Sequence, residues 1–301
     1  MTEETKKIFK VSLGKFYDNN YKKILLIPLL LSLISLVYIG YFYSQNNDFM
    51  LKDSSLTGGT TITLIGEINL QNLKSPLISQ FPDITFREIT DLKTGKPISV
   101  ILETSAEQEE VKTSIEKILG YNLTTENSSV EFTGPSLSES FYKQLMVALL
   151  ISFILMSLVV FILFRTFIPG IAVIFAAFSD LIMPLALLNF LEIRISAAGI
   201  AAFLMLIGYS VDTDILLTTR ALRGKAGNLN QRLFGAFKTG TFMTLTALIA
   251  VLPAFFIVTN LPDSFRQIFL ILAMGLFADL INTWITNMSI IKWYCDKKGI
   301  E

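Results

Sequence analysis

Long apolar runs separated by polar segments form the main pattern along this chain of 301 residues. Six runs are about twenty residues long, the length that a helix needs to cross the hydrocarbon core of a membrane. The first has a long core and ends in aromatic residues 41–43, and no small-residue cleavage site follows it. We therefore interpret it as an uncleaved signal anchor. The predicted transmembrane helices cover residues 23–43, 145–164, 168–190, 196–218, 239–258 and 266–291.

The polar segment 44–143 separates the first run from the other five. Alternating and helical patterns within it follow one another in the order strand, helix, strand, strand, helix, strand. This β-α-β-β-α-β order is that of a ferredoxin-like α+β domain. Gly58 and Gly59 are expected to form the turn into the first strand. The predicted elements are strand 60–65, helix 70–80, strand 84–90, strand 97–103, helix 106–119 and strand 128–133.

Lysine and arginine residues are unevenly distributed around the six runs. Residues 1–23 contain six lysines, and residues 219–238 contain five basic residues and no acid, whereas the short loops opposite hold only Arg194 and Arg266. By the positive-inside rule, both termini are cytoplasmic in a multi-pass protein of the cell membrane. The expected organisation is a cytoplasmic segment 1–22, a transmembrane helix 23–43, an extracytoplasmic ferredoxin-like domain 44–143, an all-α five-helix membrane bundle 144–292 and a cytoplasmic tail 293–301.

Composition excludes several kinds of site. The chain is 52% hydrophobic and 17% charged, with a mean hydropathy of +0.56, whereas soluble domains carry about 25% charged residues. Histidine is absent, which removes histidine-dependent catalytic triads and most zinc sites. The single cysteine, Cys295, excludes an internal disulfide. Basic and acidic residues are equal in number, 25 each. We expect no catalytic residue, metal, cofactor or nucleic-acid partner.

Four acidic residues interrupt the apolar runs. An aspartate near the bilayer centre costs ~3 kcal/mol on insertion scales, and no lysine or arginine lies at a comparable depth. The acids must therefore be protonated, face a hydrated cavity or meet a cation from a partner. We favour a cation-conducting or cation-sensing role for the group over the alternative, in which hydrogen bonds from the acids only hold the bundle together. The four residues are Asp180, Asp212, Asp214 and Asp279.

The fourth run contains the two acids that lie nearest to basic residues of the chain. Asp212 and Asp214 are two apart on a helix and point to nearly opposite sides. We predict that Lys238 transiently pairs with one of them, and that Thr239 and Thr241 line a hydrated space between them. The alternative is that Lys238 is an ordinary positive-inside anchor. Threonine hydroxyls in membrane helices also commonly bond the backbone of their own helix.

Five short elements, occurring in order, carry a family resemblance. They are DSSLTGGT (53–60), FTGPSLSESF (132–141), FSD (178–180), GYSVDTDILLTTR (208–220) and ADLINTW (278–284). The first contains Gly58 and Gly59, and the fourth begins with Gly208, Tyr209 and Ser210. Together they resemble the SecF family of protein-export membrane proteins, in its archaeal form, from about residue 50 to the C-terminus.

The resemblance implies membership of the resistance-nodulation-division superfamily and an accessory role in protein export. It implies SecD, the Sec translocation channel, exported unfolded polypeptide and membrane lipid as partners, with coupling to the proton gradient in bacterial members. Asp180 matches the acid of the third span in the family. Bacterial members have an acid at the position of Thr213 and an arginine at that of Thr239, so this chain departs from the family there.

Two other functions share parts of this pattern. The first is a small-molecule or ion exporter of the same superfamily, because fold alone does not fix function. Such an exporter usually carries two large outer domains and twice as many spans. The second is an intramembrane aspartyl protease, in which two acids on different helices share a proton. Those enzymes contain Tyr-Asp and Gly-x-Gly-Asp elements, whereas Asp180 follows Ser179 and Asp279 follows Ala278.

Overall fold

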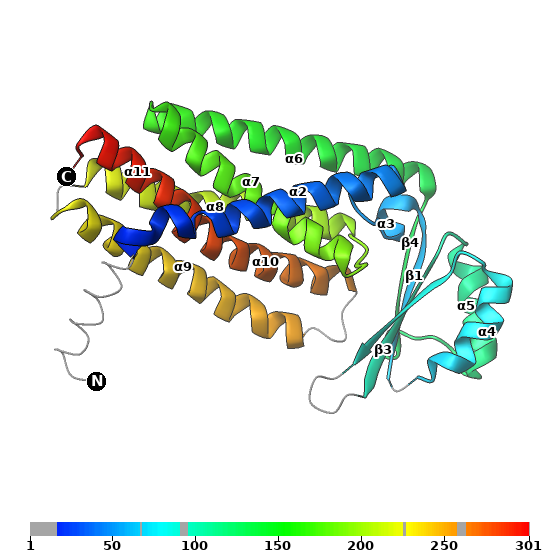
Figure 1. Ribbon diagram of the computed structural model, residues 1–301. Coiled ribbons are helices and arrows are strands. Elements are labelled where there is room, and N and C mark those ends of the chain that lie inside the picture. The colour runs from blue at the N-terminus through cyan, green and yellow to red at the C-terminus, as the bar shows by residue number, and fades with distance from the viewer. Residues whose placement is uncertain (1–16, 67, 91–95, 225–226, 258–262, 301) are drawn as a thin grey trace, which may run out of the picture.

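A computed structural model describes residues 17–66, 68–90, 96–224, 227–257 and 263–300. It consists of a long helical bundle with a smaller domain of strands and helices at one end (Figure 1). Within the described residues, six helices are long and apolar enough to cross a membrane, as the sequence predicts. They are Tyr17–Asn46, Pro135–Phe164, Phe167–Phe190, Ala197–Arg223, Leu229–Phe256 and Phe265–Lys298.

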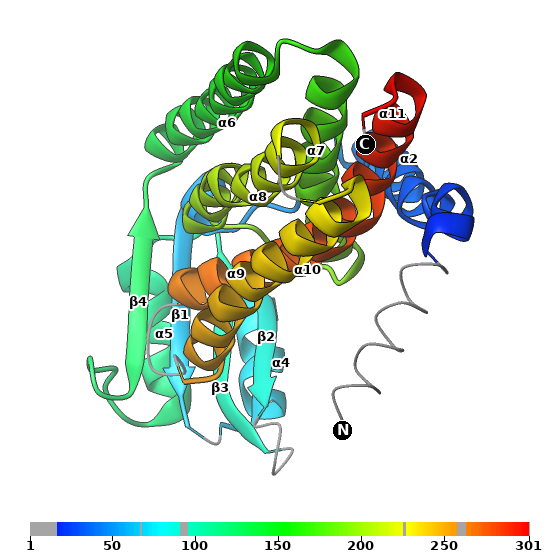
Figure 2. The same ribbon diagram turned by 90° about the vertical axis from the view of Figure 1, so that its left-hand side faces the viewer.

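The third, fourth and sixth of these helices form the centre of the bundle. They are α7 (Phe167–Phe190), α8 (Ala197–Arg223) and a composite helix that begins as α10 (Asp263–Ile281), and about half of each is buried. The other three helices expose most of their surface. In Figure 2, α2 (Leu26–Asn46) and α6 (Pro135–Phe164) lie at opposite edges of the bundle, and α9 (Leu229–Ile257) packs against α8 and α10.

The sixth span differs from the regular helix predicted over 266–291. After α10, residues Asn282–Asn287 form a π-helical turn, and α11 then runs over Met288–Lys298. A π-turn widens the helix locally and is often found at functional sites. Most of its side chains are polar and buried, so polar groups are concentrated in the middle of an otherwise apolar bundle.

At the end of the bundle remote from the smaller domain, a buried lysine joins three helices. The Lys292 Nζ atom lies 2.7 Å from Asp18 Oδ1 and donates a hydrogen bond of 2.6 Å to Asn230 Oδ1. Tyr17 adds a contact of 2.9 Å between its hydroxyl and Ser289 Oγ. Because Lys292 is only 5% exposed, loss of its counter-charge would leave a buried unpaired cation. These contacts therefore hold the helical segment 17–24 against α9 and α11.

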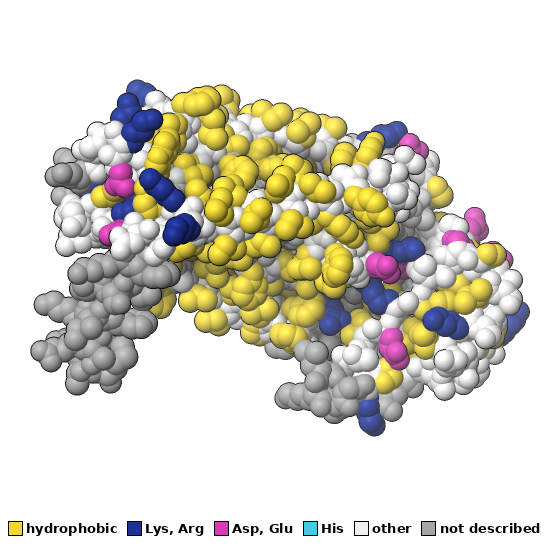
Figure 3. Space-filling view, viewed as in Figure 1, with side chains coloured by type: hydrophobic (Ala, Val, Ile, Leu, Met, Phe, Trp, Pro, Cys, Tyr) yellow, Lys and Arg dark blue, Asp and Glu magenta, His cyan; other side chains and the backbone are white. Residues whose placement is uncertain are grey.

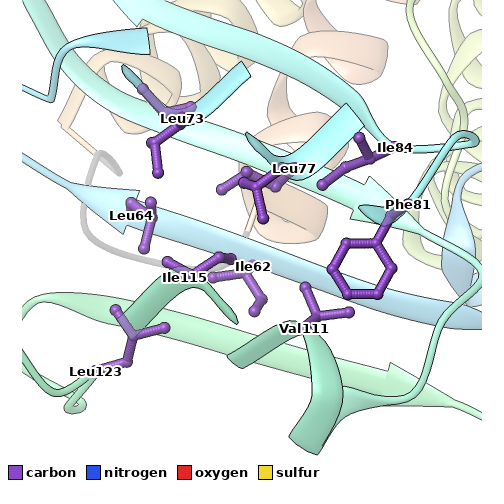
Figure 4. Close-up of a cluster of buried hydrophobic side chains, with 11 residues drawn as sticks. Ile62, Leu64, Leu73, Leu77, Phe81, Ile84, Val111, Ile115 and Leu123 are labelled. Carbon is purple, nitrogen blue, oxygen red and sulfur yellow. The ribbon is translucent and has the colours of Figure 1, made fainter. Parts of the chain in front are cut away.

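The smaller domain, called the outer domain below after its predicted location, contains six elements in the predicted order, each within two residues of the expected bounds. They are β1 (Gly59–Ile65), α4 (Leu70–Gln80), β2 (Thr85–Thr90), β3 (Pro97–Thr104), α5 (Gln108–Leu119) and β4 (Ser128–Thr133). The strands form an antiparallel sheet in the order β2-β3-β1-β4. One sheet face is covered by α4 and α5, and the residues between them include Ile62, Leu64, Leu73, Leu77 and Ile115 (Figure 4).

Two glycines fix the entry into this domain. Gly58 and Gly59 have φ angles of 88° and 127°, a region that favours glycine. A Cβ atom on Gly58 would lie 2.5 Å from Pro135 Cα, and one on Gly59 would lie 2.2 Å from the Thr104 carbonyl oxygen. Where a turn is predicted, Gly58 ends the short helix Ser54–Thr57 and Gly59 begins β1, and this passage brings β1 close both to β3 and to the start of α6.

The segment that precedes this turn is bonded to the loop between α7 and α8. Ile195 N donates to Leu51 O at 2.6 Å, and Asp53 N donates to Ile195 O at 3.1 Å. Asp53 also caps the short helix α3 (Ser54–Thr57) by accepting from Ser55 N at 2.9 Å. The outer domain is thus joined to the bundle by backbone hydrogen bonds as well as by its two connecting segments.

We expect the stability of this junction to fall as pH rises from about 4 to about 7. Desolvation raises the pKa of Asp53 to about 7; bonds from Ser55 oppose the shift, and the charge of Glu103 adds to it. An unfolded aspartate releases its proton near pH 4. The folded state therefore holds the proton over this interval, and its stabilising effect is lost as pH rises through 7.

Hydrogen exchange of the outer domain at pH 4.5 and pH 7.5, corrected for intrinsic rates, measures this effect. Asp53→Asn keeps a capping side chain and should reduce the pH dependence. Glu126→Gln, on an exposed loop of the same domain, is the matched control. Equal pH dependence in the Asp53→Asn variant and the unmodified protein would contradict the assignment.

Candidate functional site

Three of the four predicted acids meet in the centre of the bundle. Asp180 lies on α7, Asp214 on α8 and Asp279 on α10, and each is fully buried. No ion pair found among the described residues includes any of them. The partners of these carboxyl groups are instead hydroxyl and amide groups, so the cluster holds no cationic side chain of its own within that part of the chain.

Asp180 joins α7 to two neighbouring helices. Its Oδ2 atom accepts a hydrogen bond from the Ser210 hydroxyl on α8. Its Oδ1 atom accepts a hydrogen bond of 2.7 Å from Asn282 Nδ2, in the π-turn. Ser179, the preceding residue, accepts a hydrogen bond of 3.0 Å from Ser32 on α2. Polar contacts therefore run across the bundle from α2 to the sixth span.

Asp279 is surrounded by three threonine hydroxyls. Thr213 and Thr283 both donate to its Oδ1 atom at 2.8 Å, and Thr244 donates to Oδ2 at 3.1 Å. These donors lie on α8, in the π-turn and on α9, respectively. The carboxyl group therefore links α10 to three other segments, and a change in its protonation would alter contacts with each of them.

Asp214 is less completely satisfied than the other two acids. Its Oδ1 atom accepts a hydrogen bond of 2.7 Å from Asn287 Nδ2. Within the described residues, its Oδ2 atom has no hydrogen-bond partner, and neither has Asn287 Oδ1 or the Thr218 hydroxyl. Buried polar atoms are nearly always paired, and an unpaired one costs about 1–3 kcal/mol. The excess of acceptors makes this position suited to a proton, a monovalent cation or a water molecule.

Asp212 lies outside the cluster. Its side chain is exposed on the same face of α8 as Gly208, whereas Ser210 and Asp214 occupy the buried face. Tyr209, the second residue of the family motif, donates its hydroxyl to the Met243 carbonyl oxygen of α9 at 2.9 Å. Adjacent motif residues thus contact different helices: Tyr209 bonds α9, whereas Ser210 bonds Asp180 on α7.

The residues predicted to connect the acids with a cation lie in the first half of α9. Lys238 and Thr239 are exposed, and no ion pair between Lys238 and an acid occurs within the described residues. Thr239 instead accepts a hydrogen bond of 2.9 Å from Arg220, whose guanidinium also donates to the Gly235 carbonyl oxygen. The Thr241 hydroxyl has no partner in the same described part of the chain. Transient pairing of Lys238 stays a prediction.

Several partners of the acids were not singled out from the sequence. Asn282, Thr283 and Asn287 supply amide and hydroxyl groups from the π-turn, and Thr244 supplies a hydroxyl from α9. A signal for the first three exists, because polar residues recur at 279, 282, 283, 286 and 287. This spacing of three and four residues marks one polar face within an apolar span.

Comparison with known proteins gives consistent matches. A family model described as protein export membrane protein SecD/SecF, C-terminal, matches residues 112–297. Among curated relatives, all named protein-export membrane protein SecF, that of Methanothermobacter thermautotrophicus is 35% identical and the match covers 93% of this chain and 94% of the relative. That of Pyrococcus furiosus is 33% identical and covers 98% of each chain.

One solved structure has a similar fold. It is the crystal structure of SecDF, described as a translocon-associated membrane protein, from Thermus thermophilus. The TM-score is 0.72 at 18% sequence identity, and the match covers 92% of this chain but 38% of the longer SecDF chain. At this level of identity the likeness concerns the fold, including the six apolar helices and the small antiparallel sheet.

Proposed function

Because this chain belongs to the SecD/SecF family of protein-export membrane proteins, we propose that it works with SecD as an accessory subunit of the Sec translocase. The relatives that match it over nearly their whole length carry the SecF name. The SecDF chain has room beyond the matched 38% for a second unit of similar size, which supports a SecD partner. The other partners of this assembly are then the translocation channel and an exported unfolded polypeptide.

The proposed orientation places the outer domain outside the cell and both termini inside. Side chains on the helical part form an apolar band, and charged side chains gather at its two ends (Figure 3). The end remote from the outer domain carries Arg220, Arg223, Arg232 and Lys292, which agrees with the positive-inside rule. The strand order β2-β3-β1-β4 supports a ferredoxin-like assignment for the outer domain.

We further propose that the three buried aspartates respond to a monovalent cation, either a proton or a metal ion. The observation that carries this proposal is the excess of acceptors around Asp214 Oδ2. Uptake of positive charge there would pair the orphan acceptors and lessen repulsion among the carboxylates. Because the acids bond α8, α9, α10 and the π-turn, the change would alter how these helices pack. No catalytic chemistry is assigned to the chain.

Co-purification from native membranes tests the proposed role. A tagged copy of this chain, extracted in mild detergent, should retain a SecD-type protein and subunits of the translocation channel. A tagged, unrelated six-span membrane protein of the same cell is the control for nonspecific recovery. Recovery of neither partner, from membranes where both are present, would contradict the accessory role and favour an exporter that acts alone.

A further inference from the structure

A groove of about 630 Å³ lies where the outer domain meets the bundle, away from the three aspartates. Its lining comes from the outer end of α2, the end of α7 with the loop that follows, and strands β2 and β3. The groove therefore touches both the membrane-spanning part and the water-exposed part of the molecule. The lining residues that bear on its chemistry are Tyr38, Phe42, Arg87, Glu103, Asn189 and Arg194.

The helical wall of the groove is apolar and aromatic. Tyr38 of α2 and Phe190 of α7 form an edge-to-face pair with ring centroids 6.3 Å apart, and Phe42 is buried beside them. Nearby Tyr41 and Tyr43 on α2 are exposed, as is Leu191 after α7. Aromatic residues gathered at the end of a span are typical of the membrane–water interface. This wall thus lies at the depth where lipid headgroups join their chains.

The opposite wall carries paired charges from the sheet and the α7–α8 loop. Glu103 Oε2 lies 3.3 Å from Arg194 Nη1, and Glu103 Oε1 lies 3.8 Å from Arg87 Nη2. Two guanidinium groups thus flank one buried carboxylate, with a net charge of +1 for the three. Glu192, exposed on the loop, adds a negative charge in the same lining, so the four charged side chains balance and a phosphate would bind through the N–H donors of an arginine rather than through an excess of positive charge. Guanidinium groups bind phosphate oxygens well, because they present several N–H donors in one plane.

One residue of the lining also holds a buried acceptor. Asn189 lines the groove and is 2% exposed; its Nδ2 atom donates to the Phe49 carbonyl oxygen at 2.8 Å. Its Oδ1 atom has no hydrogen-bond partner within the described residues. A buried carbonyl oxygen normally receives a donor from protein, water or ligand. The ligand that suits this groove therefore carries an N–H or O–H donor close to a negative charge.

We propose that the groove binds one membrane phospholipid with a donor-bearing headgroup. The phosphate binds on the side of Arg194, a headgroup hydroxyl or amine donates to Asn189 Oδ1, and the chains lie against the aromatic wall. An exported polypeptide fits less well, because an arbitrary segment carries no fixed negative charge for the arginines, whereas every phospholipid does. A lipid held here would contact the outer domain and the bundle at once.

Native mass spectrometry of the delipidated full-length chain in detergent tests this proposal. Phosphatidylglycerol has hydroxyl donors in its headgroup, whereas phosphatidylcholine with the same chains has none. We expect one tight site for the former, with at least tenfold weaker binding of the latter. Glycerol 3-phosphate, the headgroup chemistry without chains, should not displace the bound lipid at equal concentration.

Three variants localise the site, and one serves as control. Leu191→Trp adds bulk at an exposed lining position without disturbing buried contacts, and Arg194→Gln and Asn189→Leu remove the polar partners. Each of these three variants should weaken the binding of phosphatidylglycerol at least tenfold. Arg223→Gln changes an exposed arginine at the other end of the bundle and should leave binding unchanged. If Arg194→Gln or Asn189→Leu fails to fold, the effect of Leu191→Trp on phosphatidylglycerol binding decides whether the lipid lies in this groove.

Three outcomes would overturn the proposal. The first is equal binding of the two lipids with no effect of Leu191→Trp. The second is displacement of the lipid by glycerol 3-phosphate, which would make this a site for a soluble organophosphate. The third is displacement by a reduced, alkylated polypeptide that binds more tightly than phosphatidylglycerol, which would make it a peptide site.

Discussion

Replacing Asp214 by asparagine should stabilise the protein against heat and reduce its support of protein export at least tenfold. The amide group of the new residue supplies a donor in a place where Asp214 Oδ2 and Asn287 Oδ1 have no partner in the described chain. Pairing one such orphan is worth about 1 kcal/mol. The same change removes the carboxyl group that, in our proposal, takes up a cation. Stability and function should therefore move in opposite directions.

Companion variants sharpen this test. Asp180→Asn and Asp279→Asn keep the volume but disturb carboxyl groups that already accept hydrogen bonds on both oxygens. They should lower both stability and export. Asp212→Asn, on the exposed face of α8, is the matched control and should change neither by much. Export is measured as processing and release of a secreted reporter, and stability as the melting temperature in detergent.

The opposite pattern would contradict a functional role for the cluster. If all three buried acids can be replaced by asparagine with full export, their hydrogen bonds serve only to hold the bundle together. If Asp214→Asn lowers the melting temperature, the excess acceptors around this residue are already satisfied in the native protein, and no cation is needed there.

Replacing Gly59 by alanine should unfold the edge of the outer domain that faces the bundle. The new Cβ atom would lie 2.2 Å from the Thr104 carbonyl oxygen, and the φ angle of 127° is strained for any side chain. Strain of this kind costs roughly 1–3 kcal/mol, and the backbone clash adds to it. We expect a total loss of about 3–5 kcal/mol, measured by hydrogen exchange of β1 and β3.

Gly66 offers a control that separates strain from clash. Its φ angle is 122°, close to that of Gly59, but nothing lies within 4 Å of the position that a Cβ atom would take there. Gly66→Ala should therefore show only the cost of the strained backbone. Equal exchange in the two variants would mean that β1 and β3 move apart easily, so that the close approach at Gly59 does not fix the domain entry.

The six spans and the order of the outer elements follow from the sequence, because each depends on local periodicity. Runs of about twenty apolar residues specify membrane helices, and helical and alternating patterns specify the outer elements. That Ser210 and Asp214 lie on the same face of α8 follows from their separation of four residues. Which side chains meet between helices has no such local signal: the polar spacing from 279 to 287 marks one face of the sixth span, but it does not say that Asn282 bonds Asp180 or that Asn287 bonds Asp214.

Lys238 illustrates the same limit. Whether a residue of α9 points inward depends on how the helix is rotated about its axis, and packing sets this rotation. A Cβ atom on Gly240 would lie 2.3 Å from the Trp284 ring, so this face of α9 is pressed against the π-turn. Lys238 precedes Gly240 by two residues and therefore lies on nearly the opposite side. Its exposure follows from a contact that hydrophobicity alone does not encode.

The π-turn at Asn282–Asn287 sets the rotation of α11 about the helix axis relative to α10. A π-turn accommodates one more residue than the α-helix does, and each residue corresponds to about 100° of rotation about the axis. Tightening it to α geometry would turn α11 by that angle relative to α10. The twist would sweep Asn287 away from Asp214 and carry Lys292 past Asp18 at the far end. A change in packing around the three aspartates would then reach the Lys292 contacts through a single helix.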